Sequence, residues 1–322
     1  MKTDKNIHQR WLVMKTRKWN KKTIMKSLKR NWLLYVFWLP AIIYIAVFAY
    51  APMYGIQIAF RDYRFADGFF GSEWVGLKWF KKFFDAPRFW QILKNTLTVS
   101  IYSLVVGFPF PIILALVMNN MKNLKYKKFA QTITYMPHFI STVVLVGMMH
   151  IMFSPRSGVI NTILGWIGLS GDYFFMGEPQ YYIHMYVWSG VWQSMGWGSI
   201  IYMAALAGVD LSLHEAARID GANKLQRVWY IDVPSIMPTI CIMLIMRFGS
   251  VMSVGYEKVY LMQNALNTQQ SEVISTYVYK MGLLNKQYSY STAIGLFNSV
   301  INFILVVTMN KVVKKLSGSG LW

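Results

Sequence analysis

Residues 210–235 read DLSLHEAARIDGANKLQRVWYIDVPS, and they separate two long apolar runs of the chain. Ser212 and Glu215 have the S-x-x-E spacing of a capping box, so we expect a helix to start at Leu213. Gly221 suits the position just past the end of this helix, because glycine adopts left-handed backbone angles at little cost. The stretch therefore predicts a short, capped helix between two hydrophobic segments.

A second short helix is predicted in the remainder of this stretch. Asn223 can cap it, and Leu225, Val228 and Trp229 have the i, i+3, i+4 spacing of one apolar face. Pro234 falls at the start of the next apolar run, where its missing N–H does no harm. Two interpretations stay open at this point: an amphipathic connector at the membrane surface, and an element that docks on another protein.

The rest of the chain is dominated by apolar runs. Of its 322 residues 55% are hydrophobic and 14% are charged, whereas a soluble domain carries roughly a quarter charged residues. A bilayer core about 30 Å thick needs about 20 mostly apolar residues per helix. Six runs meet or approach this length: Trp32–Tyr54, Thr96–Val117, Phe139–Phe153, Tyr182–Gly208, Ile236–Val254 and Ala293–Val313. We therefore predict an all-α polytopic membrane protein, with one membrane domain (32–322) after a basic tail (1–31).

The distribution of positive charge predicts the orientation. The net charge is +20, and most of the 33 Lys and Arg fall in the tail and in the segments 119–137, 209–235 and 311–322. The positive-inside rule then places both termini in the cytoplasm. We expect the tail to contact anionic membrane lipid. We expect no nucleic-acid partner, because no recognition motif accompanies the charge.

Several chemistries lack the residues they need. There is no G-x-x-x-x-G-K-[ST] phosphate loop, so we do not expect the chain itself to hydrolyse ATP. The five His show no ligand spacing and Cys241 is the single cysteine, so we expect no metal site. All 13 Asp and Glu fall outside the six runs, which argues against a membrane-embedded enzyme. An ion-coupled secondary transporter remains as an alternative, although such folds usually carry internal repeats and none is visible here.

Arg247 is a charged residue deep inside a predicted span. It lies roughly 16 Å beyond Ile236 at about 1.5 Å per residue, near the middle of the membrane. A charge there is costly unless it faces water or a partner. Arg247 therefore either contacts substrate in a cavity or forms a structural pair with another helix.

Other candidate pathway residues combine aromatic rings with polar groups. Sugars present apolar C–H faces and many hydroxyls, so a sugar pathway needs aromatic platforms beside amide groups. The alternative is that the aromatic residues form the interfacial belt and that the polar residues pack between helices. The candidates are Trp192, Gln193 and Trp197 in the fourth run, Tyr256 and Glu257 after the fifth, and Asn298 in the sixth.

The stretch 210–235 carries a motif that resembles a signature of a known protein family. The run Glu215-Ala216-Ala217, followed by Gly221 and later by Pro234, resembles the EAA signature of permease subunits of bacterial ABC importers. Val233 stands where Leu is commoner in that signature. Other segments resemble the maltose-type oligosaccharide and polysaccharide branch of these permeases: APMYGIQIAFRDY (51–63), GFPFPIILAL (107–116), YMPHFIS (135–141), SVGYEKVYLM (253–262), EVISTYVYKMGL (272–283) and YSYSTAIGLFNSVIN (288–302).

This resemblance implies a type I ABC importer in the bacterial plasma membrane. The chain would be a non-catalytic permease subunit and would form half of the pore with a second, homologous permease. A dimer of ATP-binding subunits would use ATP and Mg²⁺, and an extracellular or periplasmic solute-binding protein would deliver an oligosaccharide. A permease of the same fold for another solute class is the alternative. The resemblance assigns ATPase coupling to one helix and its end: Ser212, Glu215, Ala216, Ala217, Arg218, Asp220 and Gly221.

Overall fold

The structure is a computed structural model that describes residue 25 and residues 29–169, 172–318 and 320–321. The chain divides into two compact units between Gln57 and Ile58. Of the predicted basic tail only Met25 and residues 29–31 belong to the described part, so the rest of that prediction lies outside the described residues. Each unit is considered by itself.

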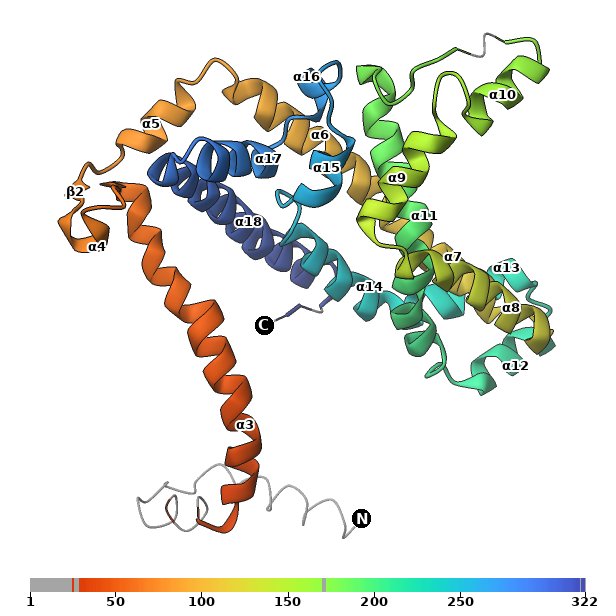
Figure 1. Cartoon of the computed structure of the whole chain (residues 1–322). Coiled ribbons are helices and arrows are strands. Elements are labelled where there is room, and N and C mark those ends of the chain that lie inside the picture. Colours follow the sequence, from red (N-terminus) through yellow and green to blue (C-terminus); the bar gives the residue numbers. More distant parts are fainter. Residues whose placement is uncertain (1–24, 26–28, 170–171, 319, 322) are drawn as a thin grey trace. The chain divides into compact units, whose positions relative to one another are not determined.

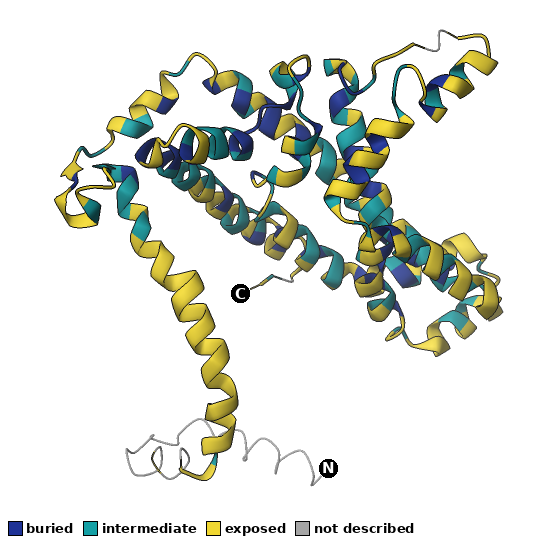
Figure 2. Cartoon of the chain, viewed as in Figure 1, coloured by how far each residue is buried: buried dark blue, intermediate teal, exposed yellow. Residues whose placement is uncertain are grey.

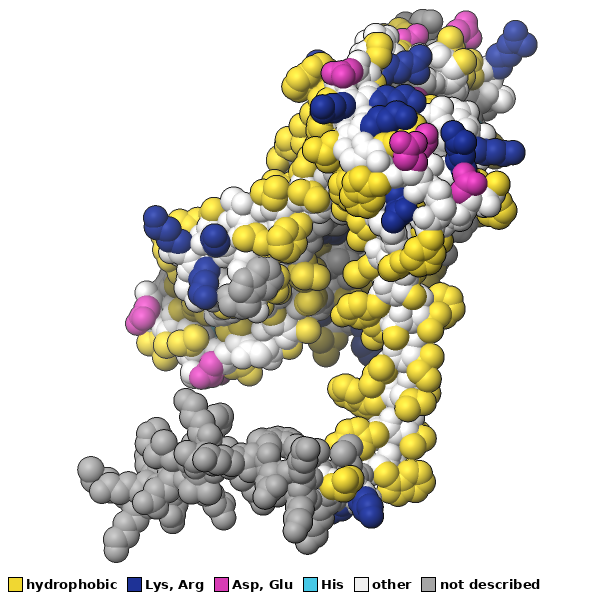
Figure 3. All heavy atoms as spheres, turned by 90° about the vertical axis from the view of Figure 1, so that its left-hand side faces the viewer, with side chains coloured by type: hydrophobic (Ala, Val, Ile, Leu, Met, Phe, Trp, Pro, Cys, Tyr) yellow, Lys and Arg dark blue, Asp and Glu magenta, His cyan; other side chains and the backbone are white. Residues whose placement is uncertain are grey.

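The long helix of the first unit is apolar on all sides. It comprises α3 (Trp32–Ile45), the π-helical turn η1 (Ala46–Tyr50) and the 3₁₀ segment η2 (Ala51–Phe60). Together these form one helix long enough to cross a membrane, as the first predicted run requires. Its side chains are exposed along α3 (Figure 2), and hydrophobic groups cover the face seen in Figure 3. Such a surface suits lipid or a protein partner rather than water.

The second unit opens with a small structured segment. Strands β1 (Arg61–Asp62) and β2 (Glu73–Trp74) pair in antiparallel register, with Arg61 opposite Trp74. Helix α4 (Gly68–Gly71) lies between them in sequence, and α5 (Lys78–Phe84) follows.

Three of the predicted runs in this unit fall wholly or mostly in long helices. The second run belongs to α6 (Phe89–Gly107) and α7 (Pro109–Asn119), which together form one spanning helix. The fifth belongs to α13 (Lys224–Arg227), η4 (Val228–Asp232) and α14 (Val233–Phe248), again one continuous helix. The sixth lies in α18 (Tyr288–Ser317). The predicted fifth span, Ile236–Val254, is wrong at both ends. The helix begins earlier and stops at Phe248, before the turn at Gly249 and Ser250.

The third and fourth runs belong to bent helix pairs. Helix α8 (Leu124–Tyr135) continues through the 3₁₀ turn η3 (Met136–Phe139) and bends by 97° into α9 (Thr142–Met152). Helix α11 (Pro179–Leu206) bends by 78° into α12 (Leu211–Ile219). Among the described residues, four helices are long and apolar enough to cross a membrane alone, and up to six spans result if each bent pair counts as one. The all-α membrane fold class is therefore confirmed.

Five short helical elements connect these spans: α10 (Val159–Trp166), α15 (Tyr256–Met262), α16 (Thr268–Ser271), α17 (Ile274–Tyr279) and η5 (Lys280–Leu284). Helix α11 packs against α6, α7, α8 and α14 (Figure 1). At Gly196 the α11 backbone lies directly on the α8 backbone at Thr134, and no Cβ atom would fit between them. Small residues permit this kind of close approach between membrane helices.

Candidate functional site

Helix α12 begins earlier than predicted. Its N-cap is Asp210, whose carboxylate accepts a hydrogen bond from the Ser212 N–H at 2.9 Å. The predicted capping box of Ser212 and Glu215, with a start at Leu213, is therefore wrong. Aspartate and serine both cap helices well, and here the aspartate two positions upstream takes the role. The same N–H holds the pKa of Asp210 below its ordinary value.

The other end of α12 is as predicted. Gly221 has φ +81°, a left-handed conformation. Its N–H donates to the Arg218 carbonyl at 3.1 Å, and the Ala222 N–H donates to the Ala217 carbonyl at 2.8 Å. These two bonds form a Schellman motif, which satisfies carbonyls at the helix end. Both ends of the helix are thus fixed by local hydrogen bonds.

The predicted cap of the second short helix is also confirmed. The Asn223 side chain accepts from the Gln226 N–H at 2.9 Å, and the Gln226 side chain accepts from the Asn223 N–H at 2.8 Å. Leu225 and Trp229 of the predicted apolar face are exposed, together with Tyr230. Large apolar side chains exposed together at this end of the helix are typical of a surface that lipid or another protein covers.

Most of α12 faces outward (Figure 2). His214 and Ala217 are partly buried and form the inner side of the helix. Ile219 is 87% exposed, and Leu211 and Leu213 are also exposed. The other six predicted coupling residues are all exposed: Ser212, Glu215, Ala216, Arg218, Asp220 and Gly221. Figure 1 shows α8, α12 and α13 at the same end of the second unit.

One buried carboxylate attaches α12 to the spans. Asp232, in η4, is fully buried, and one of its carboxylate oxygens lies 3.2 Å from Nε2 of His214. Its other oxygen accepts from the Asn120 side chain at 3.3 Å, just past the end of α7. This junction therefore joins α12, the start of the fifth span and the end of the second. Sequence reasoning missed it, because the three residues lie far apart along the chain.

A cavity of about 340 Å³ lies between the helices of the second unit. Residues of α6, α11, the end of α14, the turn 249–255 and α15 line it. Two predicted pathway residues meet there, Arg247 and Gln193. Arg247 was predicted to lie in the middle of a longer helix. It lies instead in the last turn of α14, because that helix ends at Phe248. The Gln193 amide also donates to the Ile140 carbonyl at 2.8 Å, which fixes its position.

Lys258, on α15, also lines the cavity and was missed by sequence reasoning. Its ammonium donates to the Tyr186 carbonyl at 2.9 Å and lies 4.8 Å from the centre of the Tyr186 ring. A Cβ atom at Gly190 would approach this nitrogen to 3.3 Å, so the lysine lies close against the α11 backbone. Burial lowers the pKa of Lys258 to about 8. A local signal was available, since Lys258 is the single cation of a short helix whose other residues, apart from Glu257, are apolar or aromatic.

The turn that forms part of the cavity wall is held by α18. The Asn302 side chain accepts from the Met252 N–H at 2.9 Å and donates to the Ser253 hydroxyl at 2.9 Å. The Ser275 hydroxyl donates to the Val254 carbonyl at 2.9 Å. These contacts keep the turn in one position relative to α17 and α18.

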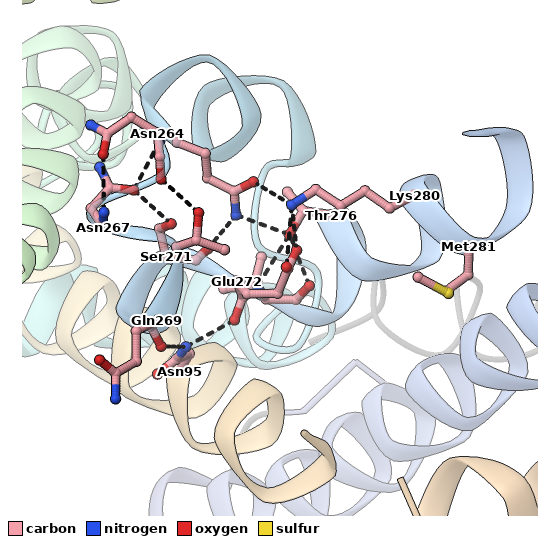
Figure 4. Close-up of polar contacts among 12 residues, drawn as sticks. Asn95, Asn264, Asn267, Gln269, Ser271, Glu272, Thr276, Lys280 and Met281 are labelled. Atoms are coloured by element: carbon pink, nitrogen blue, oxygen red, sulfur yellow. Dashed lines mark hydrogen bonds and ion pairs between the residues drawn. The ribbon is translucent and has the colours of Figure 1, made fainter. Parts of the chain in front are cut away.

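A polar network holds the end of α15 (Figure 4). Lys280 pairs with the buried Glu272 at 2.9 Å and also donates to Gln263, the residue that ends α15, at 3.0 Å. The Asn95 amide of α6 donates to the carbonyls of Gln269 and Glu272, at 3.0 Å each. The end of α15 is therefore fixed to the start of η5, and the neighbouring segment 269–272 is fixed to α6.

The remaining predicted pathway residues do not line this cavity. Trp192 lines a separate apolar hollow between α9 and α11. The Trp197 ring stacks on His138 with centroids 4.6 Å apart. Tyr256 packs against Tyr279 at 4.7 Å.

Glu257 and Asn298 complete this set. Glu257 is exposed in the first turn of α15. Asn298 is partly buried, and its side-chain oxygen has no hydrogen-bond partner among the described residues. The structure thus gathers Gln193 and Arg247 with Lys258 and separates the others. Within the described part of the chain, no group of three or more His, Cys, Asp or Glu could hold a metal ion.

Known proteins resemble this chain over nearly its whole length. Protein LplB of Bacillus subtilis (strain 168) is 42% identical over 299 residues, which cover 92% of this chain and 93% of that protein. The polygalacturonan/rhamnogalacturonan transport system permease protein YteP of the same strain is 40% identical and covers 94% of each chain.

A chain of a solved structure is similar in both sequence and fold. It belongs to a bacterial alginate ABC transporter in complex with an alginate pentasaccharide-bound periplasmic protein. The TM-score is 0.85 at 38% identity, with 92% of this chain and 99% of that chain covered. The profile of one protein family matches residues 86–318, which include α12 and every residue of the cavity. This chain belongs to that family, the inner membrane components of binding-protein-dependent transport systems.

Proposed function

We propose that this chain is one permease subunit of an ATP-driven importer for oligosaccharides, in particular fragments of polysaccharides. One observation carries the proposal: the match over 94% of both chains to a permease named for polygalacturonan and rhamnogalacturonan transport. The match to a permease chain from a transporter of the acidic polysaccharide alginate supports the same substrate class. Membership of the family leaves no support for an ion-coupled secondary transporter.

The proposed assembly contains four kinds of subunit. This chain forms half of the pore with a second, homologous permease. Two ATP-binding subunits lie below the pore and hydrolyse ATP with Mg²⁺, and an external solute-binding protein delivers the sugar. Both termini of this chain lie in the cytoplasm, in accordance with the excess of Lys and Arg in the tail and in the segments on that side.

Helix α12 is the proposed contact with an ATP-binding subunit. Its outward residues Glu215, Ala216 and Arg218 meet the partner, and exposed apolar groups such as Ile219 add hydrophobic contact area. The capped ends and the junction at Asp232 make the helix rigid. A rigid helix transmits a rigid-body movement of the ATPase to the spans, whereas a flexible loop would absorb it.

Reconstitution tests this function. The chain is purified from its native membrane with a tag in mild detergent, and mass spectrometry identifies what accompanies it. We expect a second permease, an ATP-binding subunit and a binding protein. Proteoliposomes made from this complex should then accumulate a labelled oligosaccharide when they contain ATP. A chain that is recovered alone even after crosslinking, or a complex that takes up no oligosaccharide, would overturn the proposal.

A further inference from the structure

We propose that the cavity lined by Arg247 and Lys258 binds the carboxylate of a uronic acid unit, so that the permease itself selects acidic oligosaccharides. The inference rests on the proposed function and deepens it by naming the class of sugar. It concerns the pore subunit and is independent of the selectivity of a binding protein.

The charge of the cavity wall is the first argument. Two cationic side chains line it, and no Asp or Glu lines it within the described part of the chain. Neither Arg247 nor Lys258 belongs to an ion pair among the described residues. Lys258 is partly buried, and a cation removed from water without a counter-charge is unfavourable, so an anionic ligand would stabilise it. Arg247 is exposed and adds a second positive charge to the wall. The cavity is therefore best suited to an anion.

The free hydrogen-bond donors of Lys258 are the second argument. A lysine ammonium has three N–H donors, and the described contacts use one of them, on the Tyr186 carbonyl. Burial lowers the pKa of this ammonium, so a negative charge beside it would be stabilising. A carboxylate oxygen in the cavity would accept one of the remaining donors. Charge-assisted bonds of this kind are stronger than neutral ones.

The other polar groups of the wall match the rest of a sugar. The hydroxyls of Ser103, Ser194 and Ser250 line the cavity beside the Gln193 amide. Hydroxyl and amide groups both donate and accept hydrogen bonds, as the hydroxyls of a sugar ring require. The volume of about 340 Å³ lies within the range of small-molecule sites, roughly 300–1,000 Å³. One charged and several neutral polar contacts therefore fit a single uronate unit.

Hydrogen bonds and ion pairs also hold the wall of the cavity in place. The Asn302 side chain holds the turn that forms part of its wall. The network around Glu272 and Lys280 holds the end of the helix that carries Lys258 (Figure 4). Gly190 leaves space for the lysine against α11. A cation held in place in this way binds an anion without having to be ordered first.

A binding assay on the assembled complex tests the inference. The complex is placed in lipid nanodiscs without binding protein, so that only the pore can select. The probes are radiolabelled trigalacturonate and trimannuronate, each compared with its fully methyl-esterified, neutral form. We expect the wild-type complex to bind at least one of the acids about tenfold or more tightly than its ester, as a charge-assisted hydrogen bond implies.

Two cavity variants and one control make the assay specific. Lys258→Met and Arg247→Met should each weaken binding of the acid by about tenfold or more and leave the ester within about twofold. Lys94→Met, which removes an exposed lysine that does not line this cavity, should change neither. Assembly of each variant is checked by size-exclusion chromatography.

Three outcomes would overturn the inference. In the first, the wild-type complex binds both acids as tightly as their esters. In the second, both cavity variants lose affinity for the acid and for the ester equally. In the third, both cavity variants keep the wild-type preference for the acid over the ester. Uptake by proteoliposomes with the binding protein separates this result from the function. If neutral oligosaccharides enter and no acid is preferred, the proposed function stands and the inference fails. If no oligosaccharide enters, the proposed function fails.

Discussion

Nε2 of His214 lies 3.2 Å from a carboxylate oxygen of Asp232, which is fully buried. The histidine belongs to the outward-facing helix α12, and the aspartate belongs to the helix that crosses the membrane next. Asn120 contacts the other carboxylate oxygen. A single buried side chain thus links the proposed ATPase contact to two spans, and this arrangement can be tested separately from the ATPase contact.

Substituting His214 should loosen the junction. His214→Leu leaves the buried Asp232 with Asn120 as its remaining described partner, and a buried polar group that loses a partner costs about 1–3 kcal/mol. We expect a lower midpoint of thermal unfolding for the purified complex and less uptake per ATP hydrolysed. Glu215→Ala, an exposed change on the same helix, should leave the midpoint unchanged. Equal midpoints for His214→Leu and wild type would show that the contact does not hold the helix.

Coupling should depend on the outward face and the end of α12. Glu215→Ala and Gly221→Pro should permit ATP hydrolysis while uptake falls, since the helix no longer transmits the movement. Proline cannot adopt the φ of +81° at Gly221 and lacks the N–H that bonds to Arg218. Simultaneous assays of phosphate release and sugar uptake in proteoliposomes measure the ratio. Gly165→Ala, at a glycine with open space around it, serves as the control. Normal uptake in both variants would contradict the assignment of α12.

Two asparagines of α18 offer a matched pair. Asn302 makes two hydrogen bonds to the turn at the cavity, whereas the side-chain oxygen of Asn298 has no partner among the described residues. Asn302→Leu leaves a buried N–H without its acceptor and should lower stability by about 1–3 kcal/mol. Asn298→Leu should be close to neutral. Thermal unfolding of the complex in detergent compares the two, and a larger loss for Asn298→Leu would show that the Asn298 side chain makes the more stabilising contact.

Binding of an acidic sugar should weaken at high pH. The pKa of Lys258 is lowered to about 8, so its ammonium is mostly charged at pH 7 and mostly neutral at pH 9. The uronate stays ionised throughout, and the other charged or titratable groups of the wall are Tyr186 and Arg247. We expect affinity for trigalacturonate to fall about fivefold to tenfold between pH 7 and pH 9.

The control for this profile is Lys258→Arg. Arginine keeps its charge across the range, so the pH dependence of this variant should be nearly flat. Parallel profiles for wild type and Lys258→Arg would assign the titration to another group.

Local sequence signals predicted the helix ends well where one residue decides them. Gly221 and Asn223 fix their turns through bonds to residues a few positions away, so their roles could be deduced from spacing alone. The start of α12 was misplaced because Asp210 and Ser212 both cap helices well. The end of α14 was misplaced because apolar residues continue beyond Phe248, although Gly249 and Ser250 form a turn there.

The cavity could not be deduced in the same way. Arg247 stood out because it is a charge within an apolar run, but its neighbours come from α6, α11 and α15. The role of Lys258 depends on the approach of Gly190 and Tyr186, which lie far from it in sequence. Periodicity predicts which face of a helix is apolar and does not indicate which distant helix will cover it.

The backbone contact at Gly196 restricts how the membrane helices can move. Helices α8 and α11 touch there with no side chain between them, so neither can slide along the other without driving the Thr134 carbonyl into the larger neighbours of the glycine. Each of these helices also bends into another, α9 and α12 respectively. A displacement of α12 that is passed on to α11 would therefore carry α8 with it. During transport, helices α8 and α11 would then rotate together, with α9 and α12 attached to them.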